Sequence, residues 1–122
     1  MDDFESEWDF SKPFDFIHAS TLAGSVKDFP VLFKRTIDNL KPGGWVELVD
    51  APFGFFSDDG TLEKAPNLKE LARLHEEASQ KFGKEMNSVY SHKQRLIDVG
   101  FKNVKEEIYK VCFNTTWIRR YD

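Results

Sequence analysis

The sequence has 122 residues, of which 40% are hydrophobic and 31% charged, and its formal net charge is −4. A chain of this length and composition can build the core of one small domain or of part of a larger one, which excludes compositional disorder. The acidic balance, with both signs spread along the chain, lacks the basic face that non-specific nucleic-acid binding requires. We therefore expect no direct nucleic-acid partner.

Membrane, secretion and metal signals are also missing from the sequence. No apolar run approaches the ~20 residues of a spanning helix, and the first residues, MDDFE, are acidic where a signal peptide is basic. Cys112 is the only cysteine, so the chain can form neither an internal disulfide nor a cysteine-cluster metal site. The three histidines have no metal-ligand spacing. We expect a cytoplasmic or nuclear protein with no membrane contact and no metal.

The first half of the sequence predicts a strand, a helix and a second strand. Residues 14–18 (FDFIH) are rich in aromatic and β-branched side chains and predict a strand buried on both faces. Asp28 can cap a helix that tolerates Pro30 in its first turn. The apolar face of this helix consists of Phe29, Phe33, Ile37 and Leu40. Residues 41–44 (KPGG) end the helix, and residues 45–50 (WVELVD) predict the second strand, parallel to the first.

The second half predicts a loop, two helices and a strand. Residues 51–66 form a loop that is long enough to be functional or to act as a lid. An amphipathic helix follows over residues 68–82 and is closed by Gly83. A shorter helix ends at Gly100, and the propensities of residues 104–113 favour a last strand.

The order of these elements carries a family resemblance. The segment from FDFIH through Leu40–Gly44 (LKPGG) to WVELVD resembles strand four, helix D and strand five of class I S-adenosylmethionine-dependent methyltransferases, and residues 98–101 (DVGF) precede a further strand. The resemblance implies an α/β fold: a partial Rossmann-like methyltransferase sheet, covering the region of strands four to six, with flanking helices.

Four further segments narrow the resemblance to the fungal methyltransferases related to the velvet-complex regulator of secondary metabolism. These segments are 22–25 (LAGS), 28–30 (DFP), 44–47 (GWVE) and 57–62 (SDDGTL). Members of that family carry a glycine-rich loop after the first strand and an acidic residue at the end of the second, and both hold the cofactor. The sequence contains neither feature. Its candidate glycines, Gly43-Gly44 and Gly54, do not lie between a first strand and the start of a helix, where the glycine-rich loop would be. We expect residues 1–122 to be the C-terminal portion of a methyltransferase domain, without the N-terminal half that binds most of the cofactor.

The resemblance also assigns an adenine contact near the start of the chain. An acidic residue 12 positions before Asp15 matches the family's adenine-binding acid, which is Asp3 here, and Phe4 matches the residue beside the ring. A carboxylate can accept a hydrogen bond from the adenine amino group. The alternative is a solvated acid in a frayed terminus.

Three residues fall at the carboxyl ends of the predicted strands, where open α/β sheets bind ligands. His18 and Ala19 end the first strand and are candidates to line the cofactor site, and His18 could act as a general base. The alternative for His18 is a hydrogen-bonded histidine at a strand end. Asp50 ends the second strand and is the other weak catalytic candidate. His75 and His92 lie on predicted helices, and we expect both at the surface.

These observations favour methyl transfer from S-adenosylmethionine to an unknown acceptor, by a chain that is inactive in isolation. The alternative is a non-catalytic remnant, or an interaction module that docks on a methyltransferase or on a velvet-type partner. A third reading is that the sequence is an incomplete version of a longer one, with the missing half encoded upstream. The implied partner is then that N-terminal half.

Overall fold

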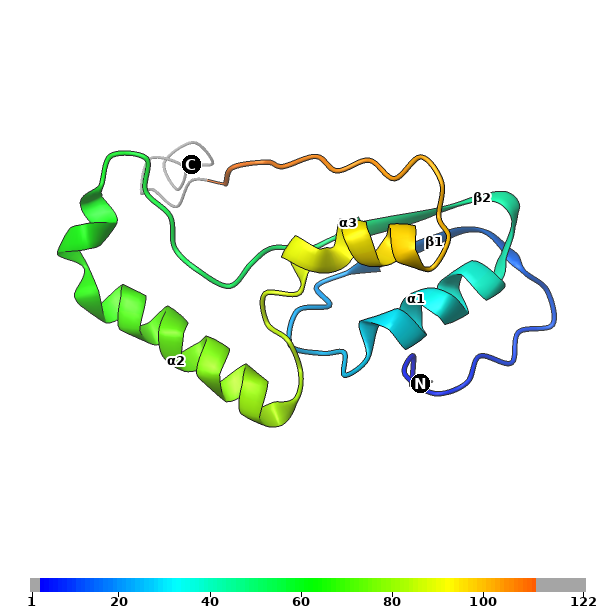
Figure 1. Cartoon of the computed structure of the whole chain (residues 1–122), viewed down its shortest axis with the longest axis horizontal. Coiled ribbons are helices and arrows are strands. Elements are labelled where there is room, and N and C mark those ends of the chain that lie inside the picture. The colour runs from blue at the N-terminus through cyan, green and yellow to red at the C-terminus, as the bar shows by residue number, and fades with distance from the viewer. Residues whose placement is uncertain (1–2, 112–122) are drawn as a thin grey trace, which may run out of the picture.

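The computed structural model describes residues 3–111 as a small α/β arrangement (Figure 1). Its elements, in chain order, are β1 (Phe14–Ser20), α1 (Phe29–Asp38), β2 (Leu40–Val49), the 3-10 turn η1 (Thr61–Lys64), α2 (Pro66–Phe82) and α3 (Val89–Asp98). The predicted strand–helix–strand unit and the two later helices are confirmed, and β1 and β2 pair in parallel as expected. In the described part of the chain, the sheet has these two strands.

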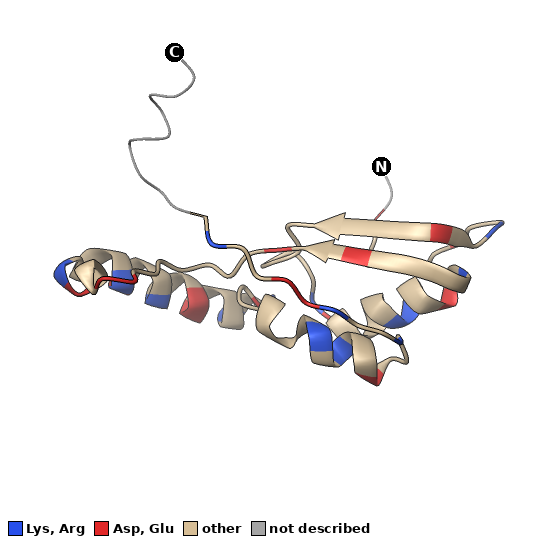
Figure 2. Ribbon diagram, turned by 90° about the horizontal axis from the view of Figure 1, so that it is seen from above, with Lys and Arg blue, Asp and Glu red and all other residues tan. Residues whose placement is uncertain are grey.

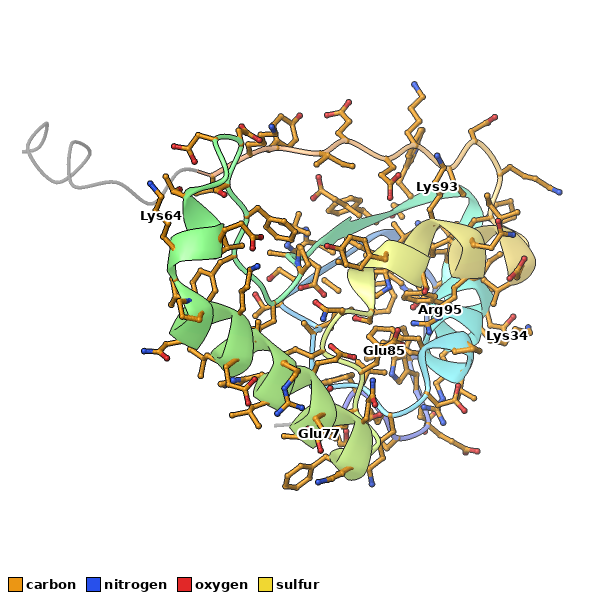
Figure 3. The ribbon with its side chains drawn as sticks, turned by 60° about the vertical axis from the view of Figure 1, so that its left-hand side comes forward. Lys34, Lys64, Glu77, Glu85, Lys93 and Arg95 are labelled. Carbon is orange, nitrogen blue, oxygen red and sulfur yellow. The ribbon has the colours of Figure 1, made fainter. Side chains whose placement is uncertain are left out.

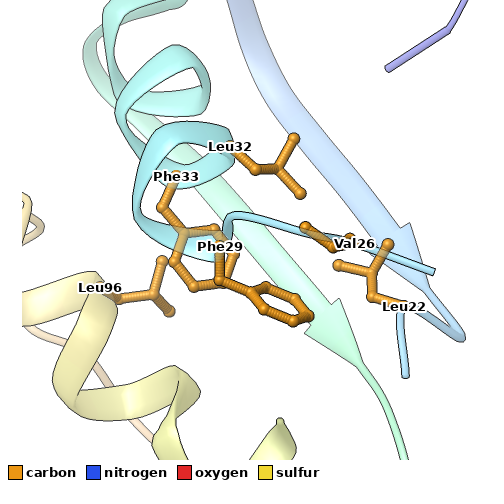
Figure 4. Close-up of a cluster of buried hydrophobic side chains, with 6 residues drawn as sticks. All are labelled: Leu22, Val26, Phe29, Leu32, Phe33 and Leu96. Carbon is orange, nitrogen blue, oxygen red and sulfur yellow. The ribbon is translucent and has the colours of Figure 1, made fainter. Parts of the chain in front are cut away.

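The helices α1 and α3 lie together on one side of the sheet, and Figure 2 shows the two strands above them. The core between them consists of Leu22, Val26, Phe29, Leu32, Phe33 and Leu96 (Figure 4). All but Leu96 come from α1 or from the loop before it, and Leu96 comes from α3. Burying one such side chain contributes about 1.5–3 kcal/mol, so this cluster holds both helices against the sheet.

Helix α1 begins as the sequence predicts. The Asp28 carboxylate accepts a hydrogen bond from the Val31 amide at 3.0 Å, and Pro30 lies in the first turn. The helix ends earlier than expected, at Asp38, with Asn39 as its C-cap. A proline ring clashes with the carbonyl group four residues before it in a helix. Pro42 would clash in this way with the carbonyl of Asp38, so the helix cannot continue through residue 42.

Residues 41–44 form a bulge inside β2 and not a turn outside the sheet. Phe14 is opposite Leu40 and Phe16 is opposite Trp45, so the extra residues of β2 loop out between these two pairs. A Cβ atom on Gly44 would lie 3.0 Å from the Lys41 carbonyl oxygen and 3.1 Å from that of Asp15. Glycine therefore allows the two backbones to approach at this point.

The second half differs from expectation in one predicted strand, and its longer helix is more exposed than an amphipathic pattern suggests. Residues 104–111 form no strand, because no described segment pairs with them and strand propensity without a partner ladder is not sufficient. Residues 112–113, and Cys112 with them, lie outside the described residues. Helix α2 ends at Gly83 as predicted, with φ of +67° there, but much of its apolar face is exposed, including Leu74 and Phe82.

The second face of the sheet is also uncovered by the described residues. Phe16, Trp45 and Val49 are exposed to 54%, 65% and 53%. The prediction that residues 14–18 are buried on both faces is therefore wrong for this chain. Parallel sheets are normally covered on both sides, so this apolar surface favours association with another chain or segment.

We expect the chain to self-associate through this face. Trp45→Lys should lower the associated fraction and leave the melting temperature within a few degrees, because the side chain is mostly exposed and contributes little to the core. Light scattering with thermal melts measures both quantities. Tyr90→Lys is the matched control, since Tyr90 is equally exposed (67%) but lies on α3. A parent chain that is a clean monomer melting above ~65 °C would contradict this account.

Candidate functional site

The carboxyl ends of β1 and β2 meet at one edge of the sheet, because the strands are parallel. The structure places His18 and Ala19 near the end of β1, and Asp50 directly after β2. The loop that follows β1 begins at this edge, where the Thr21 amide donates to the Val49 carbonyl at 3.1 Å. The edge therefore carries all three strand-end residues that the sequence singles out.

A cavity of about 140 Å³ lies between the α1-covered face of the sheet, α1 and the N-terminal segment, and Leu22 of the loop after β1 borders it. Its wall is formed by Phe4, Trp8, Ile17, His18, Ala19, Leu22, Leu32, Phe33, Thr36, Val46 and Leu48. Three of the four residues expected to contact the cofactor are thus brought together. The volume is smaller than the ~300–1,000 Å³ of typical ligand pockets, so the cavity can hold only part of a nucleoside-sized molecule.

The N-terminal segment is fastened to the body of the protein. The Asp3 carboxylate accepts from the Glu5 amide at 2.9 Å, which forms a local turn, and the Trp8 indole donates to the Phe4 carbonyl at 3.0 Å. The Glu5 carboxylate accepts from the Lys27 amide at 2.6 Å, and the Arg35 guanidinium donates to the Glu5 carbonyl. Asp3 remains exposed, but the turn that carries it is held beside the cavity.

The His18 imidazole pairs with Glu47, directly opposite in the sheet register. Nδ1 of His18 lies 2.8 Å from Oε2 of Glu47, and both side chains are about half exposed. Glu47 lies on the same face as Trp45 and Val49, since side chains alternate along a strand. Glu47 was not among the expected site residues. The signal that finds it is the parallel register, which places residues 18 and 47 side by side.

Asp50 is buried, with a side chain that is 5% exposed, and it binds backbone amides. One carboxylate oxygen accepts from the amides of Leu22 and Ala23, at 3.2 and 3.1 Å, and the other accepts from its neighbour Ala51 at 2.9 Å. The loop after β1 is therefore tied to the end of β2 by this side chain.

His92 is buried, and the prediction that it lies at the surface is wrong. Its Nε2 atom is 3.6 Å from the Asp50 carboxylate, and its ring lies 4.8 Å from the Phe29 ring and 5.5 Å from the Phe33 ring, between centroids. Burial lowers the pKa of His92, and Asp50 opposes this only in part. The missed signal is helical spacing, because residue 92 shares a face with Val89 and Leu96.

The other predicted surface histidine, His75, is half-buried and stacks on Phe53 with ring centroids 4.3 Å apart. Among residues 3–111, no group of three or more histidine, cysteine, aspartate or glutamate side chains could hold a metal ion. Within the same part of the chain, none of the helices is long and apolar enough to cross a membrane. The described residues offer an apolar cavity wall, one buried strand-end carboxylate (Asp50) and, on the opposite sheet face, the half-exposed pair of His18 and Glu47.

A parallel strand–helix–strand unit with its candidate site at the carboxyl edge defines an α/β domain of the kind that binds ligands at that edge. The comparison with protein families makes this specific. A family model described as "Methyltransferase domain" matches residues 1–106. The chain belongs to this family.

Individual relatives point to fungal secondary metabolism. The chain is 32% identical, over 91% of its length, to methyltransferase pytC of Aspergillus terreus, and 32% identical, over 88%, to the probable methyltransferase tdiE of Emericella nidulans. It is also 30% identical, over 93%, to the secondary metabolism regulator LAE1 of Cochliobolus heterostrophus.

The matches cover only part of each relative. The chain spans 34%, 33% and 38% of the lengths of these three curated proteins. No solved structure gave a significant match. The family is therefore shown by sequence, whereas the activity of the whole relatives does not transfer with it.

The buried His92 predicts a pH dependence of stability. In the unfolded chain a histidine takes up a proton as the pH falls through about 6.5, whereas the lowered pKa keeps folded His92 neutral to lower pH. The unfolded state then binds more protons, so stability is present above pH 6.5 and is lost as the pH falls below it. His92→Gln cannot titrate and should lose less stability than the parent between pH 7.5 and pH 5.5, as measured by urea unfolding. His75→Gln is the control and should keep the parental pH dependence. An equal loss in His92→Gln and the parent would show that His92 does not carry the effect.

Proposed function

We propose that residues 1–122 form the C-terminal portion of an S-adenosylmethionine-dependent methyltransferase domain and supply one wall of its cofactor cleft. The observation that carries this proposal is the cavity between the sheet, α1 and the N-terminal segment, whose wall includes residues Phe4, His18 and Ala19. In this assignment Asp3 accepts from the adenine amino group, Phe4 packs beside the ring, and His18 and Ala19 line the cleft. The region of strands four to six is the matching part of the fold.

The isolated chain does not supply the rest of the cleft. Its cavity is about 140 Å³, and the sequence contains no glycine-rich strand–loop–helix that could hold the methionine and ribose of the cofactor. Family membership and the length of the relatives support a cleft completed by a preceding N-terminal half. The chain alone is then inactive, and its first partner is that half.

Methyl transfer needs positioning more than acid–base chemistry, because the acceptor attacks the methyl group in line. The His18–Glu47 pair lies on the sheet face opposite the cavity, with Trp45 and Val49, so it suits the one proton transfer only for an acceptor that approaches from that uncovered face. If Nδ1 donates to Glu47, Nε2 carries a lone pair and can accept that proton. Asp50 is the weaker catalytic candidate, because its carboxylate is buried and occupied by backbone amides. The acceptor itself is not specified by these residues.

A second candidate function is that of an interaction module without catalysis, docking on a methyltransferase or on a velvet-type regulator. The uncovered sheet face around Trp45 and the exposed Leu74 and Phe82 of α2 favour it, since such apolar surfaces mark protein contacts. One relative is named a secondary metabolism regulator. In either role, the composition and the lone cysteine support a cytoplasmic or nuclear location.

Complementation tests the first proposal. The chain alone should bind S-adenosylmethionine only at millimolar concentration or weaker, whereas adding the N-terminal part of methyltransferase pytC should produce micromolar binding. The reason is that each recovered hydrogen bond contributes ~0.5–3 kcal/mol, and each ~1.4 kcal/mol is a tenfold change in affinity. Isothermal titration calorimetry of each component and of the mixture measures this.

Variants of Asp3 test the placement of the adenine. Asp3→Ala in the mixture should weaken binding by ~1–3 kcal/mol, the usual cost of leaving a buried donor unpaired. Asp3→Asn keeps a side-chain oxygen that can accept from both the Glu5 amide and the adenine amino group, so it should bind more tightly than Asp3→Ala. Asp38→Ala, an exposed acid on α1, is the control and should bind like the parent. If both Asp3 variants bind like the parent in a folded mixture, the placement is wrong, and if no N-terminal part associates, the interaction module is the better account.

A further inference from the structure

We propose that His92 is a positioning residue for the cofactor cleft: through Asp50 it holds the loop between β1 and α1 in the conformation that completes the cavity wall. This inference depends on the proposed function only in taking S-adenosylmethionine as the ligand of the cleft. Its structural part concerns a buried polar pair that contributes no side chain to the cavity, and it is testable without any ligand.

The loop after β1 is fixed at several points. Asp50 accepts from the amides of Leu22 and Ala23, and the next amide, that of Gly24, donates to the Glu85 carbonyl at 3.0 Å. Thr21, at the start of the loop, has a φ of +57°, a left-handed conformation that a residue with a branched side chain rarely adopts. This backbone persists because neighbouring groups hold it, and Asp50 supplies two of the hydrogen bonds.

The conformation of this loop matters for the cavity, because Leu22 lines it together with Phe4 and Ala19. Leu22 is also a member of the hydrophobic core. A shift of the Leu22 amide away from Asp50 would therefore move a cavity wall as well as loosen the core at that edge.

His92 approaches Asp50 at Oδ2, the same carboxylate oxygen that accepts from the amides of Leu22 and Ala23. Both side chains are almost fully buried, at 7% and 5% exposure, and neither ring nitrogen of His92 has another hydrogen-bond partner among the described residues. At 3.6 Å, Nε2 is just beyond hydrogen-bond length from the Asp50 carboxylate. Asp50 already accepts from three backbone amides, and the tautomer of His92 that carries its proton on Nε2 would direct a fourth N–H toward the same carboxylate.

The charged groups around His92 come from three elements. Asp50 faces it from the end of β2, Arg95 from its own helix, and Glu85 from the segment before α3. Arg95 and Glu85 are paired at 2.7 Å and lie side by side in Figure 3, so their charges largely offset each other. Helix α1 presents only the rings of Phe29 and Phe33 to the imidazole. Protonated His92 would have one unpaired opposite charge in reach, that of Asp50.

The first experiment uses the chain by itself and measures amide hydrogen exchange by NMR. His92→Phe fills the site without a donor and should speed exchange of the Leu22 and Ala23 amides by at least ~10-fold, while the amides inside α1 change little. His92→Gln places a non-titrating N–H near the position of Nε2 and should restore slow exchange.

Two results would overturn the proposal. Unchanged exchange at Leu22 and Ala23 in His92→Phe would show that Asp50 holds the loop without His92. Faster exchange everywhere by the same factor, without rescue by His92→Gln, would show that His92 is only a core residue. Neither result depends on the cofactor, so both remain distinct from a failure of the proposed function.

The second experiment adds the N-terminal part of the domain and titrates S-adenosylmethionine at pH 7.5. His92→Phe should raise the dissociation constant by ~5–20-fold, at the low end of the ~5–150-fold coupling typical of distant groups, and His92→Gln should stay within ~2-fold of the parent. His75→Gln is the matched control. Equal affinity of His92→Phe and the parent would contradict a role in the cleft even if the loop itself loosens.

Discussion

The structure depends on the closure of the parallel strand pair at its carboxyl edge. β1 and β2 pair without interruption from Phe16 opposite Trp45 to Ser20 opposite Val49. Beyond this point, the Asp50 carboxylate accepts from two backbone amides of the loop after β1 and so ties that loop to the end of β2. The Thr21 and Gly24 amides add two further hydrogen bonds, to the Val49 and Glu85 carbonyls, that hold the same loop. The cavity wall and the entry of α1 into the core both follow from this closure, since Leu22 belongs to each.

The same strand pair also explains what the chain lacks. Two parallel strands covered by α1 and α3 on one side leave an apolar face around Trp45 that a complete parallel sheet would bury. The cavity is likewise too small for the cofactor that family membership implies. Both features are consistent with a chain that covers about a third of the length of its relatives.

The local elements could be read from the sequence because they depend on neighbouring residues. Asp28 caps α1 through a contact with a residue three positions away, so distant parts of the chain do not affect it. The strand that begins at Phe14 follows from the aromatic and β-branched residues of its own segment. Long-range features could not be read in this way. The absence of a strand at 104–111 depends on a missing partner, and the burial of His92 depends on how α3 packs against α1. For the site, the strand-end positions of His18 and Asp50 were predictable, whereas their partners Glu47 and His92 required the parallel register and the helix packing.

The most direct test of the account is to locate the cofactor on this chain. Only the chain is isotopically labelled, the unlabelled N-terminal part of a relative is added, and S-adenosylmethionine is titrated while backbone NMR shifts are followed. The account predicts that the largest changes fall on Phe4, His18, Ala19 and Leu22, which line the cavity between the sheet, α1 and the N-terminal segment. Saturable changes confined to α2 or to the uncovered sheet face around Trp45 would contradict it.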